Sequence, residues 1–176
     1  CSLVIIPCKS YNHSTFYDLP VKPSPNLPNM KSIYLYPSLC LFEGTNVSIG
    51  RGTNYPFQIY GSPYIDKTNF SFSPKPVKGA KNPKHNGKSC NGYNLNLVSD
   101  SSLKKQSKLN FEWIIQMWNL TDDKTVFFRK DEFFRLLTGD NQIRNMIENN
   151  KSSIEIWMSF QDEVKQFKSI REKYLL

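Results

Sequence analysis

The chain has 176 residues, of which 14% are aromatic and 22% are charged, and its formal net charge is +8. This length is typical of one domain with a sizeable hydrophobic core, and the aromatic content excludes a disordered chain. The positive charge favours an anionic partner, either nucleic acid, an acidic membrane surface or an acidic glycan. No apolar run reaches 18 residues, so the sequence predicts no transmembrane helix.

The first 22 residues predict a linking strand followed by a loop. Leu3–Ile6 is an apolar, largely β-branched run, which is typical of a buried strand. A buried strand at this point is expected of a chain that continues a larger protein. An alternative is that Cys1 is the lipidated first residue of a lipoprotein, although the usual polar tether is missing. Four prolines between residues 20 and 28 exclude a central strand there, because proline fixes φ and lacks the backbone donor.

Residues 23–107 predict a region of short strands and long loops. The strands are expected at Ile33–Tyr36, Pro56–Tyr60, Phe70–Phe72 and Tyr93–Val98. Five lysines between residues 75 and 88 occupy a loop rich in Pro, Asn and Gly, which we interpret as solvated, with an anion-binding arm as the alternative. We interpret His13 and His85 as surface histidines. The four cysteines lack CxxC spacing, so we expect no zinc site, and no motif indicates a cofactor.

Residues 108–176 predict helices. The segment 110–120 has apolar residues at the spacing i, i+3, i+4, i+7. A short helix is expected before Gly139, and another after Asp140 as its N-cap. Ser152 and Glu155 form a capping box at the start of a last helix, whose apolar stripe we assign to core packing. The alternative is that the stripe forms a surface for a partner helix. The stripe consists of Trp157, Phe160, Val164, Phe167, Ile170 and Tyr174. Because the predicted strands come before the predicted helices along the chain, we expect an α+β fold with an irregular mixed or antiparallel sheet.

The stretch FEGTNVSIGRGT at 42–53 is rich in glycine and hydroxyl residues. It is not a phosphate loop, because five residues separate Gly44 from Gly50 and the required lysine is missing. A sugar or carboxylate site is possible: short polar side chains offer donors and acceptors, and the guanidinium of Arg51 suits a carboxylate. Glu43 follows the apolar run LCLF and is expected at the end of a buried strand. The alternative is that Glu43 and Arg51 only pair with each other and fix a turn.

Other segments can contribute to the same site. PSPN at 23–26 is a rigid loop that ends in the amide of Asn26. The segment PFQIYGSPYID at 56–66 supplies Tyr64 and Asp66, and its aromatic rings could stack on a sugar or pack in the core.

These motifs, taken together, resemble those of the NamZ-type exo-β-N-acetylmuramidases, a bacterial family formerly of unknown function. The resemblance extends over nearly the whole chain, and the sequences of the motifs are most similar to those of Bacteroidetes members. The motifs are PSPN at 23–26, YP at 36–37, EGTN at 43–46, SIGRGT at 48–53, PF at 56–57, GSPYID at 61–66, FSFSPKP at 70–76, GKSCNGYNLNL at 87–97 and FKSIREKYLL at 167–176. Among these motifs, the pair EGTN and GRGT is specific to the family.

The resemblance implies that residues 1–176 are the C-terminal α+β domain of a two-domain glycosidase. A Rossmann-like N-terminal domain, with the presumed catalytic glutamate, would lie across the active-site cleft, so this chain would be inactive alone. The implied substrate is the N-acetylmuramic acid at the non-reducing end of a peptidoglycan strand, outside the cytoplasm. Glu43 is the candidate catalytic residue. The candidate substrate-binding residues are Asn26, Thr45, Asn46, Ser48, Arg51, Thr53, Tyr64 and Asp66.

A non-catalytic module that binds cell-wall glycan would use the same residues without a second carboxylate. Only the net charge supports nucleic-acid binding, because the sequence lacks RNP, KH and helix-turn-helix patterns. We therefore expect peptidoglycan or a muropeptide as the partner, and no nucleic acid.

Overall fold

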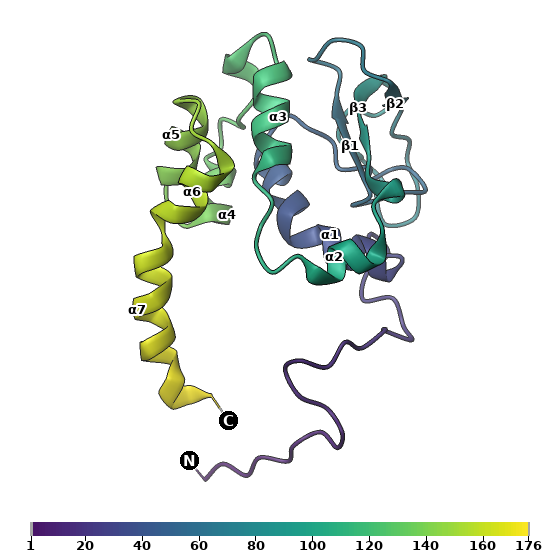
Figure 1. Ribbon diagram of the computed structural model, residues 1–176. Coiled ribbons are helices and arrows are strands. Elements are labelled where there is room, and N and C mark those ends of the chain that lie inside the picture. Colours follow the sequence, from purple (N-terminus) through teal and green to yellow (C-terminus); the bar gives the residue numbers. More distant parts are fainter. Residues whose placement is uncertain (1, 176) are drawn as a thin grey trace.

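The computed structural model describes residues 2–175 and has the predicted α+β architecture (Figure 1). A small sheet with its loops forms one side, the C-terminal helices form the other, and α3 lies between them (Figure 1). The α-helices are α1 (Met30–Leu39), α2 (Asp100–Lys105), α3 (Glu112–Leu120), α4 (Phe133–Thr138), α5 (Gln142–Glu148), α6 (Ser153–Ser159) and α7 (Gln161–Arg171). Every helix within residues 2–175 is too short or too polar to cross a bilayer.

The sheet is antiparallel, with the strand order β1-β3-β2. Its strands are β1 (Ile59–Ser62), β2 (Phe70–Phe72) and β3 (Cys90–Asn94). The prediction for Phe70–Phe72 is confirmed. The other two predicted strands are displaced: β1 shares only Ile59 and Tyr60 with the expected run, and β3 ends at Asn94, where Leu95–Leu97 turns into a 3₁₀ helix.

The predicted strand at Ile33–Tyr36 is wrong, because this segment lies within α1. Asn29 caps the helix by accepting from the Ser32 amide at 2.9 Å, and Ser32 completes a capping box. The buried face of α1 carries two serines beside Leu35 and Leu39, so its helical period is hidden from a hydrophobicity pattern.

The predicted buried strand at Leu3–Ile6 is also wrong within this chain. Residues 2–22 run as an extended segment away from the body of the molecule (Figure 1). Leu3 and Ile6 are 77% and 87% exposed. The segment approaches the body only near its end, where Asp18 pairs with Lys104 of α2 at 3.9 Å.

The helical predictions are largely confirmed. Helix α3 has the expected apolar face, Gly139 ends α4, and Ser152 and Glu155 form the capping box of α6. Asn141, not Asp140, is the N-cap of α5, although a carboxylate oxygen of Asp140 still accepts from the Gln142 amide at 2.8 Å.

The predicted last helix breaks at Phe160 into α6 and α7, and a 3₁₀ turn follows at Glu172–Tyr174. Trp157 and Phe160 pack against the core. Phe167, Ile170 and Tyr174 are instead exposed, so the assignment of the whole stripe to core packing is wrong for these three residues.

One hydrophobic cluster joins the sheet side to the helical side. The rings of Phe42 and Tyr60 stack at 5.2 Å, and Phe128 packs edge-on against Phe134 of α4 at 4.8 Å. Phe42 belongs to the 3₁₀ helix Cys40–Gly44 that continues α1. This 3₁₀ helix rests against α4 and carries Glu43, so the core places the candidate carboxylate where the two sides meet.

Candidate functional site

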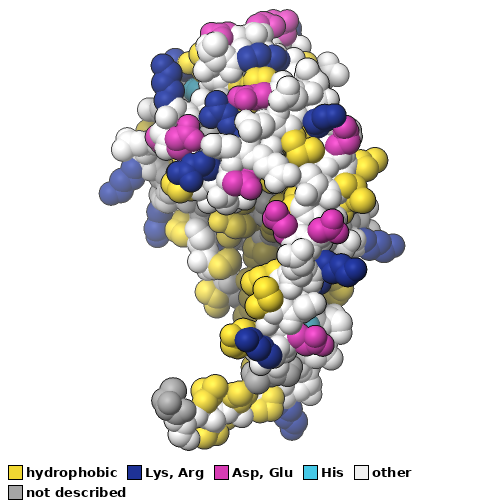
Figure 2. Space-filling view, turned by 90° about the vertical axis from the view of Figure 1, so that its left-hand side faces the viewer, with side chains coloured by type: hydrophobic (Ala, Val, Ile, Leu, Met, Phe, Trp, Pro, Cys, Tyr) yellow, Lys and Arg dark blue, Asp and Glu magenta, His cyan; other side chains and the backbone are white. Residues whose placement is uncertain are grey.

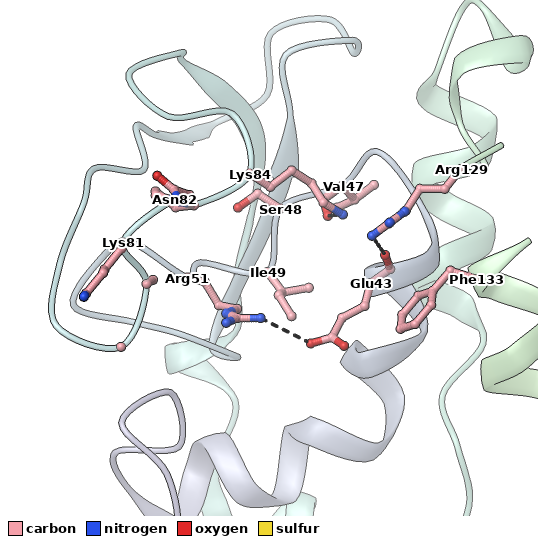
Figure 3. Close-up of a pocket in the computed structure, with 13 residues that line it drawn as sticks. Glu43, Val47, Ser48, Ile49, Arg51, Lys81, Asn82, Lys84, Arg129 and Phe133 are labelled. Atoms are coloured by element: carbon pink, nitrogen blue, oxygen red, sulfur yellow. Dashed lines mark hydrogen bonds and ion pairs between the residues drawn. The ribbon is translucent and has the colours of Figure 1, made fainter. Parts of the chain in front are cut away.

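A pocket of about 470 Å³ lies where the loop at 47–51, the loop at 79–84 and the segment after Phe128 meet (Figure 3). Its charged lining residues are Glu43, Arg51, Lys81, Lys84 and Arg129. Four cationic side chains therefore surround one carboxylate, which makes the pocket suited to a polar ligand that carries negative charge.

The glycine-rich stretch forms a tight turn that presents Arg51. Gly50 and Gly52 have φ of 75° and 87°, in the left-handed region that glycine adopts without strain. The Thr53 hydroxyl donates to the Gly50 carbonyl at 2.7 Å and closes the turn. Before the turn, Ser48 exchanges backbone hydrogen bonds with Gly61 of β1 at 2.7 and 2.9 Å. The turn is thereby fixed to the sheet, and Arg51 extends from it into the pocket (Figure 3).

Glu43 and Arg51 form an ion pair across the pocket, with Nη1 and Oε1 3.9 Å apart (Figure 3). Both side chains stay accessible, at 30% and 45% exposure. The expected position of Glu43 at the end of a strand is wrong, since it lies in the 3₁₀ helix Cys40–Gly44. The pair lies across the pocket, whereas the turn itself is held by the Thr53 hydroxyl and by the backbone hydrogen bonds between Ser48 and Gly61.

Arg129 adds a second guanidinium to the pocket lining and contacts the backbone of Glu43, not its carboxylate. Thr45 and Phe128 form an isolated β-bridge, and the Arg129 amide donates to the Gly44 carbonyl at 3.0 Å. The Arg129 side chain donates to the Glu43 carbonyl at 3.4 Å and pairs with Asp131. No local pattern in the sequence indicates this residue, because the contact joins segments 86 positions apart.

Lys84 is not solvated, in contrast to the interpretation of its loop. Its ammonium donates to the carbonyls of Phe42 at 3.2 Å, Thr45 at 2.5 Å and Val47 at 3.0 Å. Burial lowers the pKa of Lys84 to about 8, with the positive charge of Arg129 as the next cause. Lys84 thus holds the backbone around the EGTN motif with all three of its donors. The other lysines of the loop, Lys75, Lys78, Lys81 and Lys88, are exposed as expected.

His85 is half-buried, so its interpretation as a surface histidine is wrong. Its Nε2 lies in hydrogen-bond contact with the Asn46 carbonyl, which assigns the proton to that nitrogen. The Tyr64 ring packs edge-on against the imidazole at 5.8 Å. Burial lowers the pKa of His85, and the charges of Lys84 and Lys88 act in the same direction.

Three of the predicted site residues, Glu43, Ser48 and Arg51, line the pocket together. Asn26 does not line the pocket itself. Its side-chain amide donates to the carbonyl of Gly79, a lining residue, at 3.0 Å. Asp66 is exposed and does not line this pocket.

The remaining predicted residues support the backbone in this conformation. The Thr45 side chain is fully buried, and its hydroxyl donates to the Phe42 carbonyl at 2.9 Å. Thr53 closes the glycine turn. Asn46 accepts from the Ser62 hydroxyl at 3.2 Å, while its buried amide nitrogen has no hydrogen-bond partner within residues 2–175. Tyr64 packs on His85 beside Asn46.

The fold and the pocket define an α+β domain that presents a cationic, carboxylate-containing site where its two sides meet. Residues 34–176 match the family described as "Exo-beta-N-acetylmuramidase NamZ, C-terminal", and the chain belongs to this family. It is similar to the peptidoglycan β-N-acetylmuramidase NamZ of Bacillus subtilis, with 32% identity over 99% of this chain and 45% of that protein.

Two crystal structures of DUF1343 family proteins from Bacteroides fragilis are also similar. The first shares 48% identity with a TM-score of 0.93, and the match covers 100% of this chain and 49% of that one. The second, at 21% identity and a TM-score of 0.61, covers 89% and 44% and shares the fold. The chain thus spans about half the length of these relatives.

Proposed function

We propose that this chain is the C-terminal part of a peptidoglycan glycoside hydrolase that releases N-acetylmuramic acid from the non-reducing end of glycan strands. The pocket would form one wall of the cleft that holds the terminal sugar. The observation that carries this proposal is the accessible Glu43 carboxylate paired with the Arg51 guanidinium, in a pocket that Arg129 also lines, in a member of this family.

The chemistry of the sugar fits the charge of the pocket. N-acetylmuramic acid carries a lactyl carboxylate that N-acetylglucosamine lacks. Arg51 is half-exposed, and its contact with Glu43 is long for an ion pair, so the guanidinium can turn its fork towards a ligand carboxylate. Ser48 and the exposed Lys81 would supply further donors from the two loops that line the pocket.

Hydrolysis would need more than this chain. Glycoside hydrolases generally place two carboxylates on either side of the bond to be cleaved. Among the residues that line the pocket, Glu43 is the one carboxylate. Because the relatives are about twice as long, we propose that the second carboxylate comes from a further domain. Glu43 would orient the sugar or act in proton transfer, and the chain would be inactive alone.

The substrate also suggests a location. Peptidoglycan lies outside the cytoplasmic membrane, so we propose a periplasmic or extracellular enzyme, anchored as a lipoprotein or free, that acts in murein recycling. A source in the Bacteroidetes is supported by the higher identity to the Bacteroides fragilis protein than to the Bacillus subtilis one.

A titration of the chain tests the pocket itself. The ligands are a disaccharide with N-acetylmuramic acid at its non-reducing end and the matched disaccharide of N-acetylglucosamine. We expect tighter binding of the first, and loss of that preference in Arg51→Met. Arg135→Met, on the exposed face of α4, is the matched control and should keep the preference. Equal affinity of the unaltered chain for both sugars would contradict the proposal.

Turnover separates the proposal from a non-catalytic module. The chain would be joined to the half of a relative that lies outside the match. If the joined protein binds the sugar without hydrolysing it, the alternative function as a glycan-binding module is favoured.

A further inference from the structure

Two arms project from the same end of the molecule, namely the segment 2–22 and α7 with the turn that follows it (Figure 1). Neither arm is covered by the rest of the described chain. In α7 and its turn, all residues except Gln161 and Val164 are exposed. In the segment 2–22, every residue is exposed.

The α7 arm carries an apolar face that no other part of residues 2–175 covers. Phe167, Ile170 and Tyr174 are 61%, 58% and 72% exposed and follow one another at helical spacing. Phe160, Val164 and Phe167 line a shallow groove along the same helix. Hydrophobic side chains are visible along this part of the molecule (Figure 2). An isolated helix of 11 residues has only marginal stability in water. We therefore expect this apolar face to pack against a partner.

The N-terminal arm carries a second apolar feature. Leu3, Val4, Ile5 and Ile6 are consecutive apolar residues without alternation, which is the pattern of a strand covered on both faces, as in parallel sheets. All four are exposed, and within residues 2–175 none pairs with a strand. Four adjacent exposed residues of this kind mark an interaction site.

The relatives indicate what covers both arms. The match to the Bacteroides fragilis structure covers 100% of this chain with a TM-score of 0.93, so the arms are included in the superposition. That protein has about as much chain again outside the match. That extra length is enough for a second folded body, and because both arms leave the molecule at the same end, one such body would cover both.

We propose that the two arms clamp one partner, the folded domain that makes up the other half of the relatives' length. Leu3–Ile6 enters its sheet as an added strand. Phe167 and Ile170 of α7, with Tyr174 of the turn that follows, lie across its surface. The clamp also fixes the orientation of the domain that would face the pocket. The contact is made far from the pocket, by residues that do not line it.

Hydrogen exchange tests the clamp in the intact two-part protein. This chain would replace the matched half of the Bacteroides fragilis relative, and exchange in residues 3–6 and in α7 would be compared with the chain alone. We expect slowing of at least tenfold in both arms of the joined protein. Exchange at the exposed residues 122–125, outside both arms, should be the same in the two proteins.

A pair of charge substitutions identifies the contact. The double variant F167D/I170D should restore fast exchange in α7 of the joined protein and lower its melting temperature. The matched double variant L97D/I154D, at residues 91% and 69% exposed outside the arms, should do neither. Because these substitutions lie on the surface, circular dichroism of the chain alone should show that both double variants stay folded.

Two results would overturn the proposal. One is equal exchange of both arms in the joined protein and in the chain alone. The other is a dimer of the chain alone, seen by sedimentation, with both arms protected, since a second copy would then be the occupant. Neither measurement involves a sugar, so failure here would leave the proposed function of the pocket untouched.

Discussion

Lys84 and His85 are neighbours in a lysine-rich loop, and both serve the backbone that shapes the pocket. Lys84 binds three carbonyls between Phe42 and Val47, and His85 contacts the Asn46 carbonyl. The charge of Lys84 therefore adds to the positive field of the pocket without offering a free donor. Arg51, by contrast, has the exposure that a ligand contact requires.

Lys84→Met keeps the apolar stem but removes the ammonium. Three carbonyls would lose their donor, and we expect the free energy of unfolding to fall by about 1–3 kcal/mol. Denaturation by urea measures this. Lys78→Met, on the exposed part of the same loop, is the control and should stay within about 0.5 kcal/mol. Equal effects of the two substitutions would show that the three hydrogen bonds are not important for stability.

The lowered pKa of His85 predicts a loss of stability in mild acid. An unfolded histidine gains its proton near its usual pKa of about 6.5, whereas burial keeps the folded imidazole neutral to lower pH. The unfolded state then binds more protons, so stability falls as the pH drops below about 6.5 towards the folded pKa. We expect the melting temperature to fall less between pH 7 and pH 5 in His85→Gln than in the parent chain. His13→Gln, in the exposed N-terminal segment, should reproduce the parent profile.

At the scale of elements, the site depends on how closely the 3₁₀ helix Cys40–Gly44 approaches α4. A Cβ at Gly44 would lie 2.5 Å from the Cα of Phe134 and 2.7 Å from its backbone nitrogen. These are backbone atoms and cannot turn aside. The glycine of the EGTN motif therefore serves helix packing and not a phosphate, and it sets the distance between Glu43 and the segment that carries Arg129.

Gly44→Ala should separate the two elements. We expect a destabilisation of about 1–3 kcal/mol from the overpacked contact, together with weaker sugar binding, because Glu43 moves relative to Arg129. Gly87→Ala is the control: a Cβ there meets no atom within 4 Å, and only its φ of 73° is strained. It should cost about 1 kcal/mol and leave sugar binding unchanged. Intact sugar binding in Gly44→Ala would contradict this role.

The sequence predicts the helical half better than the sheet half, for physical reasons. Helix α3 is revealed by its apolar period and α6 by its capping box, both of which are local signals. Helix α1 is missed because Ser32 and Ser38 occupy its buried face and Pro37 lies inside it. The Ser38 hydroxyl accepts from the Asn110 amide at 2.9 Å, a contact that no local pattern can show.

The same limit applies to the site. Glu43, Ser48 and Arg51 lie in one motif, and the structure brings them to one pocket. Lys84 and Arg129 come from distant segments, and only the folded chain reveals their contacts. Thr45 shares the motif but is buried in the turn, so residue type and spacing alone did not separate a lining side chain from a supporting one.

At the scale of the whole molecule, one core joins a loop-rich sheet to a set of helices, and the pocket opens where they meet. The proposed position as one wall of a cleft would explain why an accessible carboxylate is surrounded by cations while no second carboxylate from residues 2–175 lines the pocket. It also agrees with a chain that spans about half of its relatives.

In the proposed function, Arg51 recognises the carboxylate of a muramic acid sugar. The most direct test is hydrolysis of β-glycosides of N-acetylmuramic acid and N-acetylglucosamine by the joined two-part protein, with and without Arg51→Met. We expect the substitution to lower the ratio of the two rates by about tenfold or more, because a charge-assisted hydrogen bond contributes roughly 1.5–3 kcal/mol. An unchanged ratio would show that Arg51 does not recognise this carboxylate.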